Sequence, residues 1–137
     1  MKKIYNATKP PIKVFGLPLL YETGEWRRLP KELAVAVPTI SSYEKIVTGG
    51  RIGFTTNASE FTIRCRIKMQ YPNERTSWLF GTGFNVYAGE RPTSRYLGYL
   101  SITENKFDWL TIEKTFKKGS CEFEDIIIFL SQMCYVE

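Results

Sequence analysis

The stretch Phe61-Thr62-Ile63-Arg64-Cys65-Arg66-Ile67-Lys68-Met69 decides the fold class of this chain, because apolar and polar residues alternate in it without a break. Successive side chains of a β-strand point to opposite faces, so the pattern predicts a strand with one buried and one exposed face. Further strands are expected, between turn-rich pieces, at residues 51–56, 84–88, 96–102, 109–115 and 125–130. Short strands at this spacing predict an all-β fold, a jelly-roll-like β-sandwich.

The 137 residues are expected to form one domain, since a domain of this size can bury a substantial core. Residues 1–47 are interpreted as an N-terminal arm followed by a loop region with at most one or two short helical turns. Prolines interrupt the arm, and Pro30 is suited to open a helical turn. Residues 48–130 are expected to hold the sandwich core and residues 131–137 a tail. The stretch 126–130 is apolar on both faces and is expected to lie deep between layers.

Composition bounds the class of protein. Hydrophobic residues make up 43% of the chain and aromatic residues 15%, which excludes wholesale disorder, and no apolar run approaches the ~20 residues of a membrane span. Met1-Lys2-Lys3 is not followed by the apolar segment of a signal peptide, so a soluble, cytoplasmic protein without membrane contact is expected. The three cysteines lack metal-ligand spacing, so neither a metal nor another cofactor is predicted, and Cys65 is interpreted as a buried apolar residue.

The chain contains no histidine, which excludes a Ser-His-Asp triad within it. The Gly-x-Ser-x-Gly elbow of many esterases is also absent. Close carboxylate pairs occur at Glu22 with Glu25 and at Glu122 with Glu124, and solvated charges are the favoured interpretation over a glycosidase pair. No catalytic residue is predicted, and the isolated chain is expected not to be an enzyme.

Aromatic residues supply the candidate ligand-binding groups. A flat indole or phenol ring can pack on the apolar face of a sugar while amide and guanidinium groups bind its hydroxyls. Trp78 is the first candidate, because the stretch 75–78 reads as a loop with polar neighbours, although a core aromatic is the more frequent role for such a residue. The other candidates are Tyr87, Asn85, Trp26 and Arg28. Trp26 could equally pack under Arg28 in a cation–π contact, with Arg28 buried as a structural clamp.

A basic strand face raises a further alternative. The net charge is +5, and Arg64, Arg66 and Lys68 share the exposed face of the 61–69 strand. Single-stranded nucleic acid is held by such cations beside stacking aromatics. Cations on an exposed strand face more often serve solubility and protect sheet edges, so nucleic acid is the least favoured ligand.

Three ordered motifs resemble one family. Gly83-Phe84-Asn85-Val86-Tyr87 resembles the Gly-x-Asp-Leu-Tyr signature of the N-terminal β-sandwich domain of certain bacterial SGNH (GDSL-type) hydrolases, relatives of carbohydrate esterases, with Asn85 in place of the acid. The alternation places Phe84 and Val86 on one face of this strand, and Asn85 and Tyr87 on the other. The stretch 25–30 resembles the family's aromatic-x-Arg-Leu-Pro motif, and 49–58 its Gly-x-Ile-x-Phe-x-Thr-Asp-Ser strand, with Asn57 and Ala58 replacing Asp-Ser.

The resemblance implies a non-catalytic accessory domain of a carboxyl-ester hydrolase, which supports a separate catalytic domain and shapes a sugar cleft. Its partners would be that catalytic domain, a carbohydrate, or a second copy of this chain. The alternatives are a self-standing carbohydrate-binding module and, third, a nucleic-acid-binding β-domain. In the family a closing strand follows the strand at 125–130, and the tail here is not expected to supply one. The apolar stretch 126–129 is therefore expected to form an exposed edge or face that drives self-association.

Overall fold

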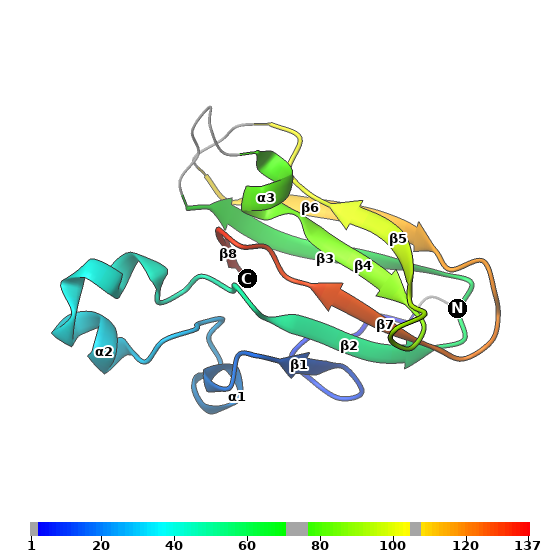
Figure 1. Ribbon diagram of the computed structural model, residues 1–137, viewed down its shortest axis with the longest axis horizontal. Coiled ribbons are helices and arrows are strands. Elements are labelled where there is room, and N and C mark those ends of the chain that lie inside the picture. Colours follow the sequence, from blue (N-terminus) through cyan, green and yellow to red (C-terminus); the bar gives the residue numbers. More distant parts are fainter. Residues whose placement is uncertain (1–2, 71–76, 105–107) are drawn as a thin grey trace.

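A computed structural model describes residues 3–70, 77–104 and 108–137, in which two antiparallel sheets pack face to face (Figure 1). The strands of the larger sheet lie in the order β1-β2-β7-β4-β5, and those of the smaller sheet in the order β6-β3-β8. The predicted all-β sandwich is therefore confirmed. Within the described residues, no helix has the length and apolar character needed to cross a membrane.

The alternating stretch that decided the fold class forms β3 (Glu60–Met69), the central strand of the smaller sheet. It pairs with β6 (Leu110–Lys117), where Cys65 lies opposite Ile112, and with β8 (Cys134–Val136), where Met69 lies opposite Cys134. Its apolar residues face inward. Phe61 packs edge-on against Phe54 and stacks on Phe116, with ring centroids 5.5 and 5.7 Å apart.

The larger sheet contains β1 (Lys13–Phe15), β2 (Arg51–Thr56), β4 (Phe84–Ala88), β5 (Arg95–Leu100) and β7 (Glu124–Phe129). One continuous core fills the space between the two sheets, and its fully buried members include Val47, Ile67, Val86, Ile126 and Cys134. Burying this apolar surface is the main stabilising contribution, at about 25 cal/mol per Å².

The tail and β7 depart from what the sequence suggested. The tail supplies β8, which pairs with β3, so the expectation of a missing closing strand is wrong. The expected exposed edge at 126–129 is also wrong, because β7 lies between β2 and β4 and is hydrogen-bonded to both. Only alternate residues of β7 are deeply buried. Ile126 and Ile128 face the core, whereas Ile127 is half-buried on the outer face.

Four short helical segments occur in the described residues, where the sequence suggested one or two turns. They are α1 (Leu19–Thr23), α2 (Lys31–Ala36), the 3₁₀ segment η1 (Pro38–Tyr43) and α3 (Trp78–Thr82). Pro30 precedes α2 directly, so the predicted helical region is present, and α2 with η1 projects from one end of the sandwich (Figure 1). The sequence suggested a loop at 75–78, but its last residue, Trp78, is the first residue of α3. Residues 71–76 lie outside the described residues.

A charged cluster ties β6, β5 and β7 together at one end of the sandwich. The Nζ atom of Lys118, which is almost fully buried, lies 3.5 Å from Glu124 Oε1. Arg95 Nη2 lies 2.6 Å from Glu124 Oε2, and the Ser120 hydroxyl donates to Oε1 of the same carboxylate. The hydrogen bond from Ser120, with that from Arg95 second, lowers the pKa of Glu124 below its usual 4.5. The carboxylate is therefore ionised at neutral pH and clamps the three elements.

Candidate functional site

The outer face of the five-stranded sheet carries the candidate site. In β4, Phe84, Val86 and Ala88 are buried, so Asn85 and Tyr87 point outward, as the alternation predicted. Strand register sets their neighbours on this face. Asn85 lies between Phe129 of β7 and Tyr99 of β5, and Tyr87 lies between Ile127 of β7 and Tyr96 of β5.

The rings on this face contact one another. Tyr87 lies 5.2 Å from Tyr96 and 5.6 Å from Phe129 between ring centroids, and the second pair meets edge to face. The guanidinium carbon of Arg91 lies 5.1 Å from the centroid of Phe129, a cation–π contact that holds this side chain over the sheet. A register shift between Val86 and Tyr87 brings Tyr96 opposite Tyr87. The result is an aromatic cluster with a guanidinium group beside it.

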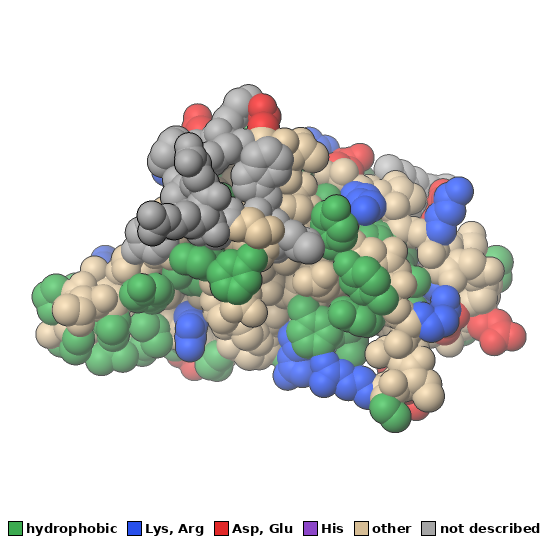
Figure 2. All heavy atoms as spheres, turned by 45° about the horizontal axis from the view of Figure 1, so that its top comes forward, with side chains coloured by type: hydrophobic (Ala, Val, Ile, Leu, Met, Phe, Trp, Pro, Cys, Tyr) green, Lys and Arg blue, Asp and Glu red, His purple; other side chains and the backbone are tan. Residues whose placement is uncertain are grey.

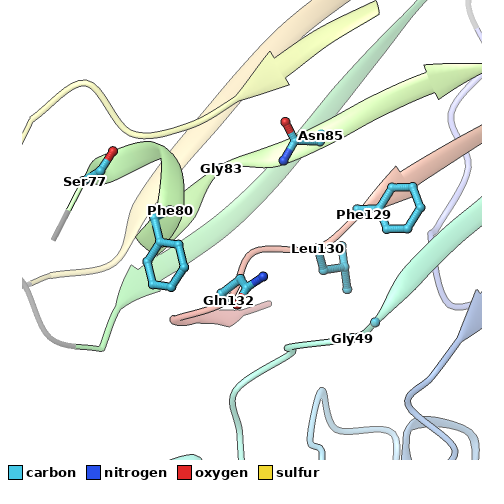
Figure 3. A pocket seen from close by; sticks show the side chains of 9 residues that line it. Gly49, Ser77, Phe80, Gly83, Asn85, Phe129, Leu130 and Gln132 are labelled. Carbon is cyan, nitrogen blue, oxygen red and sulfur yellow. The ribbon is translucent and has the colours of Figure 1, made fainter. Parts of the chain in front are cut away.

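A shallow depression of about 420 Å³ adjoins this cluster (Figure 3). Its wall comes from the turn before β2, from α3 and the start of β4, and from the segment after β7. The lining residues are Gly49, Gly50, Ser77, Phe80, Gly83, Asn85, Phe129, Leu130 and Gln132. None of them carries a charge, and Phe80, Asn85 and Gln132 bring a ring and two carboxamides to one opening. The volume falls within the roughly 300–1,000 Å³ typical of small-molecule sites.

Gly50, which lines the depression, is closely packed on its other side. A Cβ atom at Gly50 would lie 2.8 Å from Cδ1 of Leu130 and of Leu17, and 2.9 Å from the carbonyl oxygen of Val47. Only glycine allows the turn to approach β7 so closely, and the Leu130 amide donates to the Gly50 carbonyl at 3.0 Å. The second glycine of the Gly49-Gly50 pair is therefore a packing requirement.

The Asn85 carboxamide has a defined orientation. The Tyr96 hydroxyl donates to Asn85 Oδ1 at 3.2 Å, which leaves the amide nitrogen as the donor toward the depression (Figure 3). Desolvation by burial, with Tyr87 and Tyr99 adding to it, raises the pKa of Tyr96 above its usual 10.0. The hydroxyl therefore keeps its proton at neutral pH and remains a donor to Asn85.

The structure brings only part of the predicted site together. Asn85 and Tyr87 share the outer face, whereas Trp26 packs against the core and does not line the depression. Trp78 begins α3, next to Ser77 in the wall, but its side chain lies outside the described part of the chain. Arg28 is exposed, so its expected role as a buried clamp is wrong.

The buried arginine is the preceding residue. Arg27 is 5% exposed, and its Nη2 atom lies 2.8 Å from Glu25 and 3.9 Å from Glu44. The amides of Arg28 and Leu29 donate to the Glu44 carbonyl at 2.7 and 3.2 Å, which fixes the turn of the chain at this point. That turn directs Arg27 inward and Arg28 to solvent. The described contacts include no ring contact between Arg28 and Trp26.

Several residues of the site were not among the sequence candidates. Phe80, Phe129 and Gln132 come from α3, β7 and the segment after β7, and only the tertiary fold places them around one opening. The sequence did contain a signal for the outward position of Phe129. Strict alternation assigns Ile127 and Phe129 to the face opposite Ile126 and Ile128, but the uninterrupted apolar run masked that alternation.

The outer face of the smaller sheet differs in character. Arg64 lies 3.7 Å from Glu113, and Arg66 lies 2.5 Å from Glu137 and 5.5 Å from the centre of the Trp109 ring. The Thr62 and Thr115 hydroxyls hydrogen-bond to each other across the strands at 2.8 Å. Two of the three cations that suggested nucleic acid thus have carboxylate partners, which weakens that alternative.

The thiols of Cys65 and Cys134 offer little nucleophilic chemistry at neutral pH. Burial raises the pKa of Cys65 and of Cys134 to about 12, with the neighbouring Cys134 adding to the shift at Cys65. Cys121 is exposed. No group of three metal-ligating side chains gathers among the residues that the structure describes. The groups that do converge, aromatic rings, carboxamides and a guanidinium, are suited to binding.

Comparison with known proteins locates the fold. No protein-family profile matches the chain, and no curated protein sequence matches it significantly. Among solved structures, the chain is similar to a protein from Bacteroides ovatus described as a GDSL-like lipase, with a TM-score of 0.67 and 18% sequence identity. The match covers 91% of this chain and 36% of that protein, so the chain spans about a third of its length. At this identity the likeness establishes a common fold.

Proposed function

We propose that this chain is a non-catalytic, N-terminal accessory domain of a GDSL-type carboxyl-ester hydrolase, which supports the catalytic domain and forms one side of a sugar cleft. The observation that carries the proposal is the fold match, because nearly the whole chain corresponds to one third of a GDSL-like lipase. The sequence motifs at 25–30, 49–58 and 83–87 support the same family.

The chemistry of the chain supports an accessory role over a catalytic one. The sequence holds no histidine, so the proton relay of a Ser-His-Asp esterase would have to come from another domain. The outer face of the larger sheet supplies binding groups, which is what a wall of a substrate cleft needs.

A self-standing carbohydrate-binding module is the second candidate. The depression beside the Tyr87–Tyr96 pair favours it, since rings and carboxamides in one shallow opening are suited to a sugar without any catalytic domain. The two candidates differ in whether the chain needs a hydrolase partner.

The first step of the test is to search the same gene and its neighbours for a catalytic domain with a Ser nucleophile and an Asp-x-x-His segment. The second step is to co-express that domain with the 137-residue chain. We expect the two to co-purify and the catalytic domain alone to be less stable. Aryl acetate hydrolysis should follow the catalytic domain and be absent from this chain. The accessory role is refuted if no such domain is encoded there, or if the two remain separate; sugar binding by the chain alone would then favour the self-standing module.

A further inference from the structure

The two outer faces of the sandwich are unequal. An antiparallel sheet normally buries one face and presents polar side chains to water on the other. The smaller sheet follows this rule with its threonines and paired arginines, whereas the larger sheet presents several aromatic side chains. In the sheet, Tyr96 is 52% exposed, Phe15 is 48% exposed and Tyr99 is 45% exposed; Phe80 of the adjoining α3 is 52% exposed. The register interrupts these rings with Arg51 and Asn85, so the face combines exposed aromatic groups with polar and charged ones, as binding surfaces often do.

The charges on this face are also unequal. Register places Arg51 between Phe15 and Phe129, and Lys13 beside it on β1. The guanidinium group of Arg91 lies over the ring of Phe129. Within the described residues, none of these three cations forms an ion pair. The carboxylate of Asp125, on the same face, accepts a hydrogen bond from the Thr55 hydroxyl at 2.6 Å. Figure 2 shows lysine and arginine side chains beside the hydrophobic ones over this sheet.

Phe129 connects the depression to the cations, because it lines the depression and its ring contacts the Arg91 guanidinium. A ligand seated in the depression would meet the Phe80 ring and the amides of Asn85 and Gln132. Its neighbouring group would then reach the guanidinium groups of Arg91 and Arg51. Stacking on Phe129 holds Arg91 in position, so less side-chain entropy is lost when its N–H groups engage a carboxylate.

We propose that the outer face of the five-stranded sheet binds an acidic oligosaccharide, with a sugar ring in the depression between Phe80, Asn85 and Gln132 and a sugar carboxylate on Arg91 and Arg51. A pyranose offers the apolar C–H face and the ring of hydroxyls that the uncharged lining fits. The unpaired cations at the adjoining end select a carboxylate over a neutral group. Single-stranded nucleic acid is less well matched, because it needs cations along its whole length and the depression has none.

The inference deepens the proposed function and rests on it only for the biological setting, since binding is measured on the 137-residue chain alone. The probes are hexagalacturonate, cellohexaose and a hexathymidylate, titrated by calorimetry and followed by the side-chain amide NMR signals of Asn85 and Gln132. We expect hexagalacturonate to bind with a Kd below about 1 mM at low salt. Both amide signals should shift, and added salt should weaken binding.

Matched variants locate the site. Phe80→Ala and Arg91→Gln should each weaken hexagalacturonate binding about tenfold, the size expected for a lost ring contact or charge-assisted hydrogen bond. Phe123→Ala and Arg64→Gln change exposed residues that do not line the depression and should leave the Kd unchanged. All four change exposed side chains, and a melting curve for each shows that it is folded.

Three results would overturn the inference. They are no binding of hexagalacturonate at 10 mM, equal effects of the site and control variants, or tighter binding of cellohexaose or hexathymidylate than of hexagalacturonate. In each case the accessory role is tested separately, by co-purification with the catalytic domain. Failure of the oligosaccharide proposal can therefore be distinguished from failure of the accessory role.

Discussion

Replacing Arg27 by methionine tests the account of the buried arginine. The guanidinium is almost fully buried, and Nη2 contacts the carboxylates of Glu25 and Glu44 at 2.8 and 3.9 Å. Within the described residues, the Nε atom is buried without a hydrogen-bond partner. Methionine keeps the length and the apolar stem of the side chain but removes the charge and its donors.

The expected loss of stability follows from how deeply the partners are buried. Breaking a fully buried ion pair costs about 3–5 kcal/mol, because it leaves an uncompensated charge. Here the side chains of Glu25 and Glu44 are 52% and 23% exposed, so water can solvate them after the change. Removing the unpartnered Nε also relieves a desolvation cost. We therefore expect Arg27→Met to lower the free energy of unfolding by about 1–2 kcal/mol.

The measurement is urea denaturation at pH 7 together with the melting temperature. At ~2.1 cal/mol/K of unfolding entropy per residue, the loss corresponds to a fall of about 4–7 °C for this chain. Arg28→Met is the matched control, since Arg28 is exposed and its backbone contacts are unaffected; it should change stability by less than about 0.5 kcal/mol. In the double variant Arg27→Met/Glu44→Gln the loss should be smaller than the sum of the single losses. Equal effects of Arg27→Met and Arg28→Met, or a neutral Arg27→Met, would refute the reasoning.

Three further outcomes are expected. Because the pKa of Glu124 is lowered in the folded state, the stability that its carboxylate contributes is present above pH 4.5 and is lost as the pH falls through the lowered value. The difference in free energy of unfolding between wild type and Glu124→Gln, measured in urea, should therefore vanish over that range. A difference that stays constant with pH would argue against this role. A thiol reagent at pH 7.5 should label Cys121 quickly, and should label Cys65 and Cys134 only after denaturation, as mass spectrometry of the native protein can show. Phe116→Ala should cost about 3–5 kcal/mol in the same urea assay, and a loss below ~1 kcal/mol would contradict its place in the core.

The strands were predictable wherever the period of two was strong. β2 and β4 have the predicted bounds, and β3, β6 and β7 differ from the prediction by two residues or fewer at either end. β1 and β8 have three residues each, too few for a periodic signal, and exist because a neighbouring strand offers them a partner. Their pairing is a long-range property, which local sequence does not encode.

The choice between Arg27 and Arg28 shows a second limit. Both residues are arginines within one motif, so composition and spacing cannot distinguish them. The decision depends on the Glu44 carbonyl, which accepts from two successive amides and turns the chain so that Arg27 points inward. A contact between segments 16 residues apart therefore decides which charge is buried.

The candidate site was half predictable for the same physical reason. Alternation in β4 correctly placed Asn85 and Tyr87 on one outer face. What alternation could not supply was the identity of the neighbouring strands, because the sheet order puts β7 directly beside β4 although two strands, β5 and β6, lie between them in sequence. That pairing turns Phe129 from a presumed core residue into the link between an uncharged depression and two unpaired guanidinium groups. The proposed binding surface is thus a consequence of sheet topology acting on an apolar strand, and a change that disturbs the β4–β7 register should abolish the surface even with every side chain retained.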